Sequence, residues 1–220
     1  MRLGLALAMM VGASLRDLRT RRVPNVYWVP FIAAAGALWL GDLVVGAWSL
    51  AGLLWALGTT AFLYAIWWLG LFGGADAKGL MVLAWLWPVA PDPLVGTMTP
   101  TMDALINGTF AVAAVPALFL VWNLLRGDLR MPAALLGVRM DLQRARRRFV
   151  WPMEDGERFR YMHRPGTDPG PTFDRLEAQG RRRIWVTPKV PFMIPLTVGL
   201  VLHALHGNLV LRAMAAWLRP

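Results

Sequence analysis

The stretch that decides the fold is residues 44–71, VVGAWSLAGLLWALGTTAFLYAIWWLGL, which holds no charged side chain over 28 positions. About 20 consecutive apolar residues are enough for an α-helix to cross the hydrocarbon core of a bilayer. The stretch therefore predicts a membrane-spanning helix. It ends at Gly73-Gly74-Ala75-Asp76, where two glycines and an acid interrupt the apolar run.

Apolar runs on both sides of this stretch raise the predicted number of spans to six. We place them at Leu3–Leu15, Val26–Leu40, Val44–Leu71, Gly79–Pro88, Ala104–Leu125 and Val190–Leu205, the last continuing toward Trp217. The first run has the length of a signal peptide, but no polar mature region follows it, so we expect it to be retained. The predicted fold class is all-α: a polytopic membrane protein of about six transmembrane helices.

The composition agrees with this class. Hydrophobic residues fill 57% of the 220 positions and charged residues only 16%, where a soluble domain carries about a quarter. The formal net charge is +10, and basic side chains at a membrane boundary set topology and bind anionic lipid headgroups. We therefore expect membrane lipids with anionic headgroups, and no nucleic acid, as partners. Cysteine is absent, which excludes disulfides, thiol catalysis and cysteine-ligated zinc.

Residues 126–188 differ in character from the rest of the chain. They hold 14 arginines and eight acidic residues, with proline and glycine scattered among them. We predict a large cytoplasmic basic insertion before the last helix, partly amphipathic, with a helix lying in the membrane interface near residues 132–140. The expected organisation is a membrane domain at 1–125 with about five helices, the insertion at 126–188, and the last transmembrane helix and tail at 189–220.

The distribution of basic residues predicts the orientation. With six spans, the loop Arg16–Arg22, the turn Gly73–Lys78 and the stretch Arg126–Lys189 share one face, which holds 20 Lys and Arg side chains against three on the other. The rule that positive residues stay inside applies to short loops, and four arginines lie within the seven residues 16–22. We therefore expect this face to be the cytoplasmic face of the cell membrane.

Two aspartates share that face. Asp17 and Asp76 are 59 positions apart, but two predicted crossings separate them, so both lie at the cytoplasmic boundary. The acids Asp42, Asp92 and Asp103 fall on the opposite face. Two carboxyl groups held close together tend to share one proton. Such a pair activates water for attack on a peptide carbonyl without a covalent nucleophile.

Each acid also has a simpler interpretation. Asp76 would serve as a helix cap, with Lys78 as an interfacial anchor. Asp17 would be neutralised by the neighbouring arginines.

The residues that flank the two acids resemble those of the type IV prepilin peptidases. After Asp17, basic residues lead to the pair Pro24-Asn25 that opens the next span, as in the first catalytic segment of that family. The segment Gly73-Gly74-Ala75-Asp76-Ala77-Lys78 resembles the second, a Gly-x-Gly-Asp motif before a short helix that begins with Lys. The archaeal prepilin and preflagellin peptidases, which lack a cysteine-rich N-terminal region, are the most similar branch.

This resemblance implies a membrane-embedded aspartyl endopeptidase that cuts the short basic leader from prepilin or preflagellin (archaellin) precursors at the cytoplasmic face. It implies Asp17 and Asp76 as the catalytic pair, Gly73, Gly74 and Lys78 as supports, and Pro24 and Asn25 as residues that orient the turn. Ala75 stands where the motif has its second glycine, so backbone flexibility rests on Gly73 and Gly74 alone. The resemblance implies no cofactor and no metal.

Two other classes of function stay open at this stage. A small proton- or cation-coupled transporter would use the aspartates as a relay, although neither acid lies at mid-membrane. A non-enzymatic scaffold of a pilus or secretion assembly would not need them. His203 and His206 lie three positions apart, but no carboxylate is near them in sequence, so we expect no metal site. Nothing in the sequence indicates the precursor or the oligomeric state.

Overall fold

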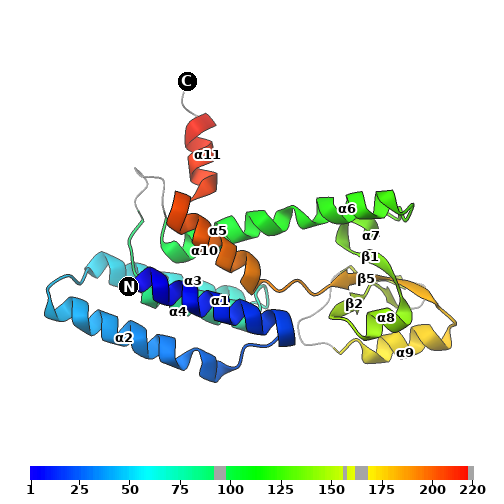
Figure 1. Ribbon diagram of the computed structural model, residues 1–220, viewed down its shortest axis with the longest axis horizontal. Coiled ribbons are helices and arrows are strands. Elements are labelled where there is room, and N and C mark those ends of the chain that lie inside the picture. Colours follow the sequence, from blue (N-terminus) through cyan, green and yellow to red (C-terminus); the bar gives the residue numbers. More distant parts are fainter. Residues whose placement is uncertain (92–97, 156–157, 162–167, 218–220) are drawn as a thin grey trace. The chain divides into compact units, whose positions relative to one another are not determined.

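The computed structural model describes residues 1–91, 98–155, 158–161 and 168–217 (Figure 1). Asp92 lies outside these residues. The chain divides into two compact units, which are described separately. Unit 1 comprises residues 1–112 and 191–220, and unit 2 comprises residues 113–190.

Unit 1 is helical. Its elements are α1 (Arg2–Thr20), the 3-10 helix η1 (Asn25–Tyr27), α2 (Val29–Val44), α3 (Leu50–Trp68), α4 (Gly74–Leu86), α5 (Pro100–Ala113), α10 (Met193–His206) and α11 (Leu209–Trp217). The short helix α4 packs against α1, α2 and α3, and α1 also packs against α10 (Figure 1). The core between them is built from fully buried apolar side chains, which include Met9, Met10, Leu80, Leu83 and Leu196.

The helices α5 and α10 approach so closely that only glycine fits between them. A Cβ atom at Gly108 would lie 2.7 Å from the carbonyl oxygen of Pro195, and one at Gly199 would lie 2.7 Å from the amide nitrogen of Gly108. Small residues at helix contacts in membranes allow this kind of backbone approach. This crossing joins α10 to α5, in addition to the packing of α10 against α1.

Three segments of the described chain are long and apolar enough to cross a membrane: Asn25–Val44, Leu50–Trp68 and Pro100–Leu125. The helices α10 and α11 meet at a bend of 52° and add a fourth only if the bent pair forms one span. Two predicted spans fall short of this test. The first, Leu3–Leu15, has 13 residues between the charged side chains at the two ends of α1, and α4 also has 13 residues, which is about 20 Å of helix against a hydrocarbon core of about 30 Å. Six crossings stay a prediction.

Unit 2 combines helices with short strands. Its helices are α6 (Val115–Leu125), α7 (Ala133–Leu136), α8 (Leu142–Arg146) and α9 (Gly170–Ala178). Its strands are β1 (Val138–Asp141), β2 (Val150–Pro152), β3 (Glu154–Asp155), β4 (Arg158–Phe159) and β5 (Arg183–Pro188). The antiparallel sheet has the order β1-β5-β2, and β3 pairs with β4.

The prediction of an all-α fold is wrong for the insertion. Ile184 and Val186 of β5 point into one apolar cluster, and Trp185 between them points into another with Ala133 and Met153. Apolar side chains therefore cover both faces of this strand, and β-branched residues favour that position. Only a few residues between Arg183 and Pro188 show this alternation of faces, so the sequence gives only a weak signal for a strand.

The predicted interfacial helix near residues 132–140 is also wrong beyond Leu136. Gly137 adopts an extended backbone and ends α7. A Cβ atom at Gly137 would lie 2.9 Å from the carbonyl carbon of Val186, so the glycine lets the chain enter the sheet directly as β1.

Candidate functional site

Asp17 lies in the last turn and a half of α1, beyond its apolar part. The helix ends because Arg21 takes a left-handed conformation with φ 55°, and its backbone N–H donates to the carbonyl oxygen of Asp17 at 2.9 Å. A non-glycine residue rarely adopts this conformation, and strained backbone of this kind concentrates at functional sites. Pro24 then continues in an extended conformation and starts η1 at Asn25.

Three opposing influences act on the carboxyl group of Asp17. Burial raises its pKa, whereas the positive charge of Arg21 and a hydrogen bond from the backbone N–H of Met193 lower it. Near this point, α1 is also attached to α10 by side chains, since Ser14 Oγ and Thr197 Oγ1 lie 2.7 Å apart. The position of Asp17 therefore depends on α10, which follows it by more than 170 residues.

Asp76 lies in the first turn of α4, directly after the two glycines. Gly73 is the N-cap residue with an extended backbone, and a Cβ atom there would lie only 2.5 Å from Asp76 Oδ2. The carboxylate thus folds back over Gly73, and a side chain at this position would have to displace it. At Gly74 a Cβ atom would lie 3.4 Å from Trp67 Nε1, which is a tight contact but not a clash.

The surroundings of Asp76 favour its neutral form. Its side chain keeps part of its accessible surface, but the protein atoms around it exclude much of the solvent. Burial, and to a lesser extent the negative charge of Asp17, raises the pKa of Asp76 to about 7. The two carboxyl groups are therefore within electrostatic range of one another, as their predicted pairing requires.

Asn25 and Lys78 are also brought together. Lys78 Nζ donates a hydrogen bond to Asn25 Oδ1 at 2.7 Å, across 53 positions of sequence. This bond joins the turn after α1 to the first turns of α4. It links the two segments that carry Asp17 and Asp76.

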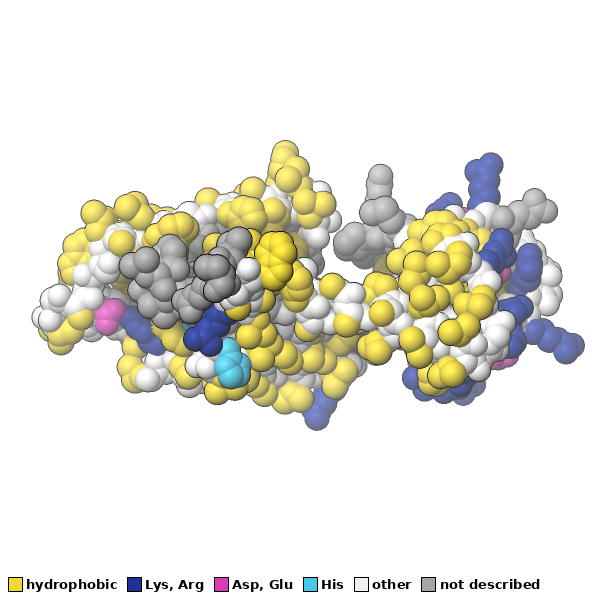
Figure 2. All heavy atoms as spheres, turned by 90° about the horizontal axis from the view of Figure 1, so that it is seen from above, with side chains coloured by type: hydrophobic (Ala, Val, Ile, Leu, Met, Phe, Trp, Pro, Cys, Tyr) yellow, Lys and Arg dark blue, Asp and Glu magenta, His cyan; other side chains and the backbone are white. Residues whose placement is uncertain are grey.

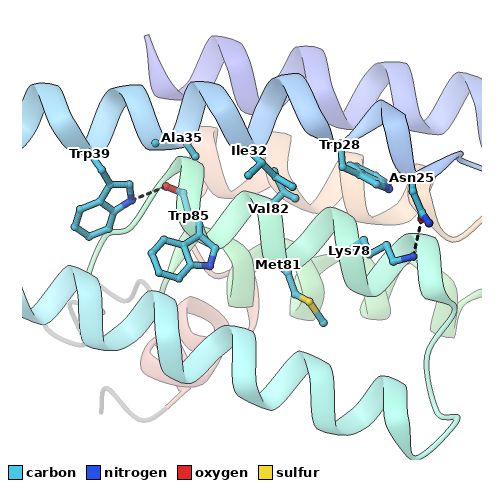
Figure 3. A pocket seen from close by; sticks show the side chains of 10 residues that line it. Asn25, Trp28, Ile32, Ala35, Trp39, Lys78, Met81, Val82 and Trp85 are labelled. Atoms are coloured by element: carbon cyan, nitrogen blue, oxygen red, sulfur yellow. Dashed lines mark hydrogen bonds between the residues drawn. The ribbon is translucent and has the colours of Figure 1, made fainter.

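An apolar groove of about 680 Å³ begins at this hydrogen bond and follows α2 and α4 (Figure 3). Its walls are a helical stripe of α2 with Trp28 and Ile32 and a stripe of α4 with Met81. At its other end Trp39 Nε1 donates to the carbonyl oxygen of Trp85 at 3.1 Å. A hydrogen bond to α4 therefore lies at each end of the groove, from η1 at one end and from α2 at the other.

Tyr27 is a site residue that sequence reasoning missed. Its hydroxyl donates to the carbonyl oxygen of Met9 at 2.7 Å, and the guanidinium of Arg16 lies 4.5 Å from the centre of its ring. Gly12 provides the space for this hydroxyl on the surface of α1. Tyr27 thus fixes the turn that carries Asn25 against the helix that carries Asp17. A single tyrosine near an apolar run gives no signal of this role.

Two further acids among the described residues of unit 1, Asp42 and Asp103, have partners of their own. Asp42 forms an ion pair with Arg2. Asp103 is completely buried, and its carboxylate lies 2.7 Å from both His203 Nδ1 and Asn208 Nδ2. The sequence analysis found no carboxylate for this histidine because Asp103 precedes it by 100 positions. Within the described residues, no cluster of three or more potential ligands is suited to a metal ion.

Comparison with known proteins identifies the class to which this fold and site belong. A family model described as the type IV leader peptidase family matches residues 4–125, more than half of the chain. The chain belongs to this family of peptidases. The matched region contains both aspartates, the glycine pair and the Asn25–Lys78 bond.

Two archaeal relatives are similar over nearly their whole length. The preflagellin peptidase of Methanococcus maripaludis is 26% identical over 226 residues, which cover 92% of this chain and 93% of the relative. The preflagellin peptidase of Methanocaldococcus jannaschii is 23% identical over 220 residues, covering 89% of each. This agrees with the resemblance noted in the sequence to the archaeal branch of the family.

Proposed function

We propose that this protein is a membrane-embedded aspartyl endopeptidase in which Asp17 and Asp76 activate water together. The observation that carries the proposal is the electrostatic coupling of these two carboxyl groups within the segment that matches a leader peptidase family. Asn25, Lys78 and the two glycines support the pair by fixing the segments on which it stands. The close approach of Gly73 to Asp76 and the hydrogen bond between Asn25 and Lys78 support these roles.

The surroundings assign a different role to each acid. Asp76 has its pKa raised to about 7, so a large share of the molecules carry its proton near neutral pH. Burial also raises the pKa of Asp17, but Arg21 and the Met193 amide oppose this effect, so Asp17 gives up its proton more readily than Asp76. Asp17 is then the general base and Asp76 the general acid, as expected for a pair whose environments separate their pKa values.

The reaction proceeds by proton transfer without a covalent intermediate. Asp17 accepts a proton from water as the water oxygen attacks the carbonyl carbon of the scissile peptide bond. Asp76 donates its proton to the carbonyl oxygen, which gives a neutral tetrahedral diol. When the C–N bond breaks, Asp17 returns its proton to the leaving nitrogen, and Asp76 regains its proton from the hydroxyl group that becomes the new carboxylic acid.

The proposed substrates are type IV prepilin-like or preflagellin precursors. The names of both relatives support preflagellin, and the motifs in the sequence support the wider prepilin class. Cleavage of the basic leader would take place at the cytoplasmic face, where the positive-inside pattern puts both aspartates.

Substitution of each acid by its amide tests the proposal. Asp17→Asn and Asp76→Asn should each abolish leader cleavage of a co-expressed preflagellin, while the protein still inserts into the membrane in normal amounts. Asp42→Asn makes the same chemical change at a boundary acid that is paired with Arg2, and should leave cleavage intact. Full processing by either of the first two variants would refute the catalytic pair.

A further inference from the structure

Unit 2 contains a polar pocket that the proposed reaction does not use. It has a volume of about 250 Å³ and is lined by four arginines, Arg130, Arg139, Arg181 and Arg183, and by the two acids Asp128 and Glu154. The space-filling view shows many Lys and Arg side chains, in dark blue, on the surface of this unit (Figure 2). Four guanidinium groups against two carboxylates leave the pocket with two excess positive charges.

The two acids are already engaged by the protein. Asp128 lies 3.3 Å from Arg139 and 3.4 Å from Arg183, so it holds these two guanidinium groups in place. Glu154 is buried, and its Oε1 accepts a hydrogen bond of 2.8 Å from the backbone N–H of Trp185. The carboxylates therefore shape the pocket but do not neutralise it. Within the described residues, neither Arg130 nor Arg181 forms an ion pair with an acid.

The pocket begins directly after a candidate membrane span. The span Pro100–Leu125 ends with α6, and residues 127–130 that follow it line the pocket. Near this end the guanidinium of Arg126 lies 4.2 Å from the ring centre of Trp122, a pairing typical of the membrane interface. The pocket therefore directly follows the end of a segment that is long and apolar enough to cross a membrane.

A buried asparagine attaches the segments around the pocket to the end of α6. Asn123 in the last turn of α6 donates hydrogen bonds from Nδ2 to the carbonyl oxygens of Ala134 at 2.9 Å and Gly137 at 2.7 Å. These bonds attach α7 and the start of β1 to the end of α6. Beside the pocket, Leu129 and Met131 expose 55% and 59% of their surface, an arrangement suited to contact with acyl chains.

We propose that this pocket binds the phosphate group of an anionic phospholipid, with the acyl chains against Leu129 and Met131. Guanidinium groups bind phosphate oxygens through paired hydrogen bonds, and here two of them are preorganised by Asp128. A lipid is the source that fits best, because the pocket adjoins the end of a span and exposed apolar side chains. Binding would fix unit 2 to the membrane surface.

The test uses the full chain, purified and delipidated in a neutral detergent and titrated with three phosphate compounds. Phosphatidylglycerol should bind and raise the melting temperature, since a ligand that binds only the folded state stabilises it. Phosphatidylcholine, whose headgroup has no net charge, should bind much more weakly. Soluble glycerol phosphate, which lacks acyl chains, should also have little effect.

Two substitutions separate a specific site from a general attraction. Arg181 and Arg147 are both exposed on unit 2, but only Arg181 lines the pocket. Arg181→Gln should weaken phosphatidylglycerol binding about fivefold, whereas Arg147→Gln, with the same loss of charge, should leave it unchanged.

Three results would overturn the proposal. Equal weakening by both variants would mean that only net charge matters. Equal binding of both lipids would exclude recognition of the anionic headgroup. Binding of glycerol phosphate as tight as that of phosphatidylglycerol would show a site for a free anion instead.

Discussion

Asp17 and Asp76 carry the same carboxyl group, and their different surroundings give them different chemistry. Asp17 has a cation and a backbone amide nearby, which stabilise its charge. Asp76 has a more buried environment and a negative neighbour, which stabilise its proton. A peptidase with one ionised and one protonated carboxyl needs this asymmetry.

The pH dependence of cleavage follows from this asymmetry. The rate should fall as the pH rises through about 7, because Asp76 then loses the proton that it donates. It should also fall in acid, because Asp17 gains a proton and no longer accepts one from water. A bell-shaped profile of kcat/KM is therefore expected, measured by leader cleavage with the detergent-solubilised enzyme.

Substitution of Arg21 tests the acid limb of this pH profile. Its charge lowers the pKa of Asp17, so Arg21→Gln should raise that pKa and move the acid limb to higher pH, with little change in the alkaline limb. Arg22→Gln removes a charge from the adjacent, exposed position and should leave both limbs in place. An acid limb that does not move in the Arg21 variant would contradict the assignment of Asp17 as the base.

The glycine pair offers a second test at the scale of single residues. A methyl group at Gly73 would displace the Asp76 carboxylate, whereas one at Gly74 meets only a tight contact with Trp67. Gly73→Ala should therefore reduce kcat by one to two orders of magnitude, as expected when a reacting group is misplaced by about 1 Å. Gly74→Ala should retain most activity. Equal loss in both variants would mean that backbone flexibility, not space for the carboxylate, is what the motif supplies.

Among the helices, the contact between α5 and α10 is the least tolerant of change. Gly199→Ala should destabilise unit 1 by about 1–3 kcal/mol, the range for overpacking a close contact, because backbone atoms surround the new methyl group. Gly58→Ala in α3 adds the same group to open space, and should stabilise by about 0.5–1 kcal/mol through helix propensity. Thermal unfolding in detergent measures both effects, and a Gly199 variant as stable as wild type would contradict the close approach.

The sequence predicts helices better than it predicts their ends or the strands. The run at 44–71 predicts a span, but α3 begins only at Leu50, because the hydroxyl oxygen of Ser49 accepts a hydrogen bond from the N–H of Gly52 and caps the helix. The polar cap is local and could have been recognised. The strand β5 could not be recognised as readily, since its partners β1 and β2 lie more than 30 residues before it.

In the candidate site, too, the sequence predicts the residues of local motifs but not those that reach the site through tertiary contacts. Counting spans and the flanking motifs together predict the pair Asp17 and Asp76, and the same motifs select Asn25 and Lys78. The Met193 amide and the Tyr27 hydroxyl could not be found in this way. They act on the site through tertiary contacts, and neither belongs to a motif.

For the molecule as a whole, charge and hydropathy are divided between two units. Unit 1 carries the long apolar helices and exposes many apolar side chains, including Leu54, Phe62 and Trp68. Unit 2 holds most of the arginines and a small mixed core around β5. A bilayer solvates the first kind of surface and attracts the second to its headgroups.

The membrane topology is the prediction that belongs to this scale, and the chain is suited to testing it because it contains no cysteine. Single cysteines can be introduced at exposed positions and labelled in intact cells with a thiol reagent that does not cross membranes. Val45→Cys, in the loop between α2 and α3, should react from outside. Arg22→Cys and Arg147→Cys should react only after the cells are opened, because both positions lie on the side with most of the positive charge.

The result bears directly on catalysis, since Asp17 and Asp76 can act together only at one face. Two crossings between them, by α2 and α3, are required for this, and both helices are long and apolar enough. A cysteine at position 22 that reacts on the same side as one at position 45 would remove the first of these crossings. The two acids would then face opposite compartments, and the electrostatic coupling between them would have to arise in some other arrangement of the helices.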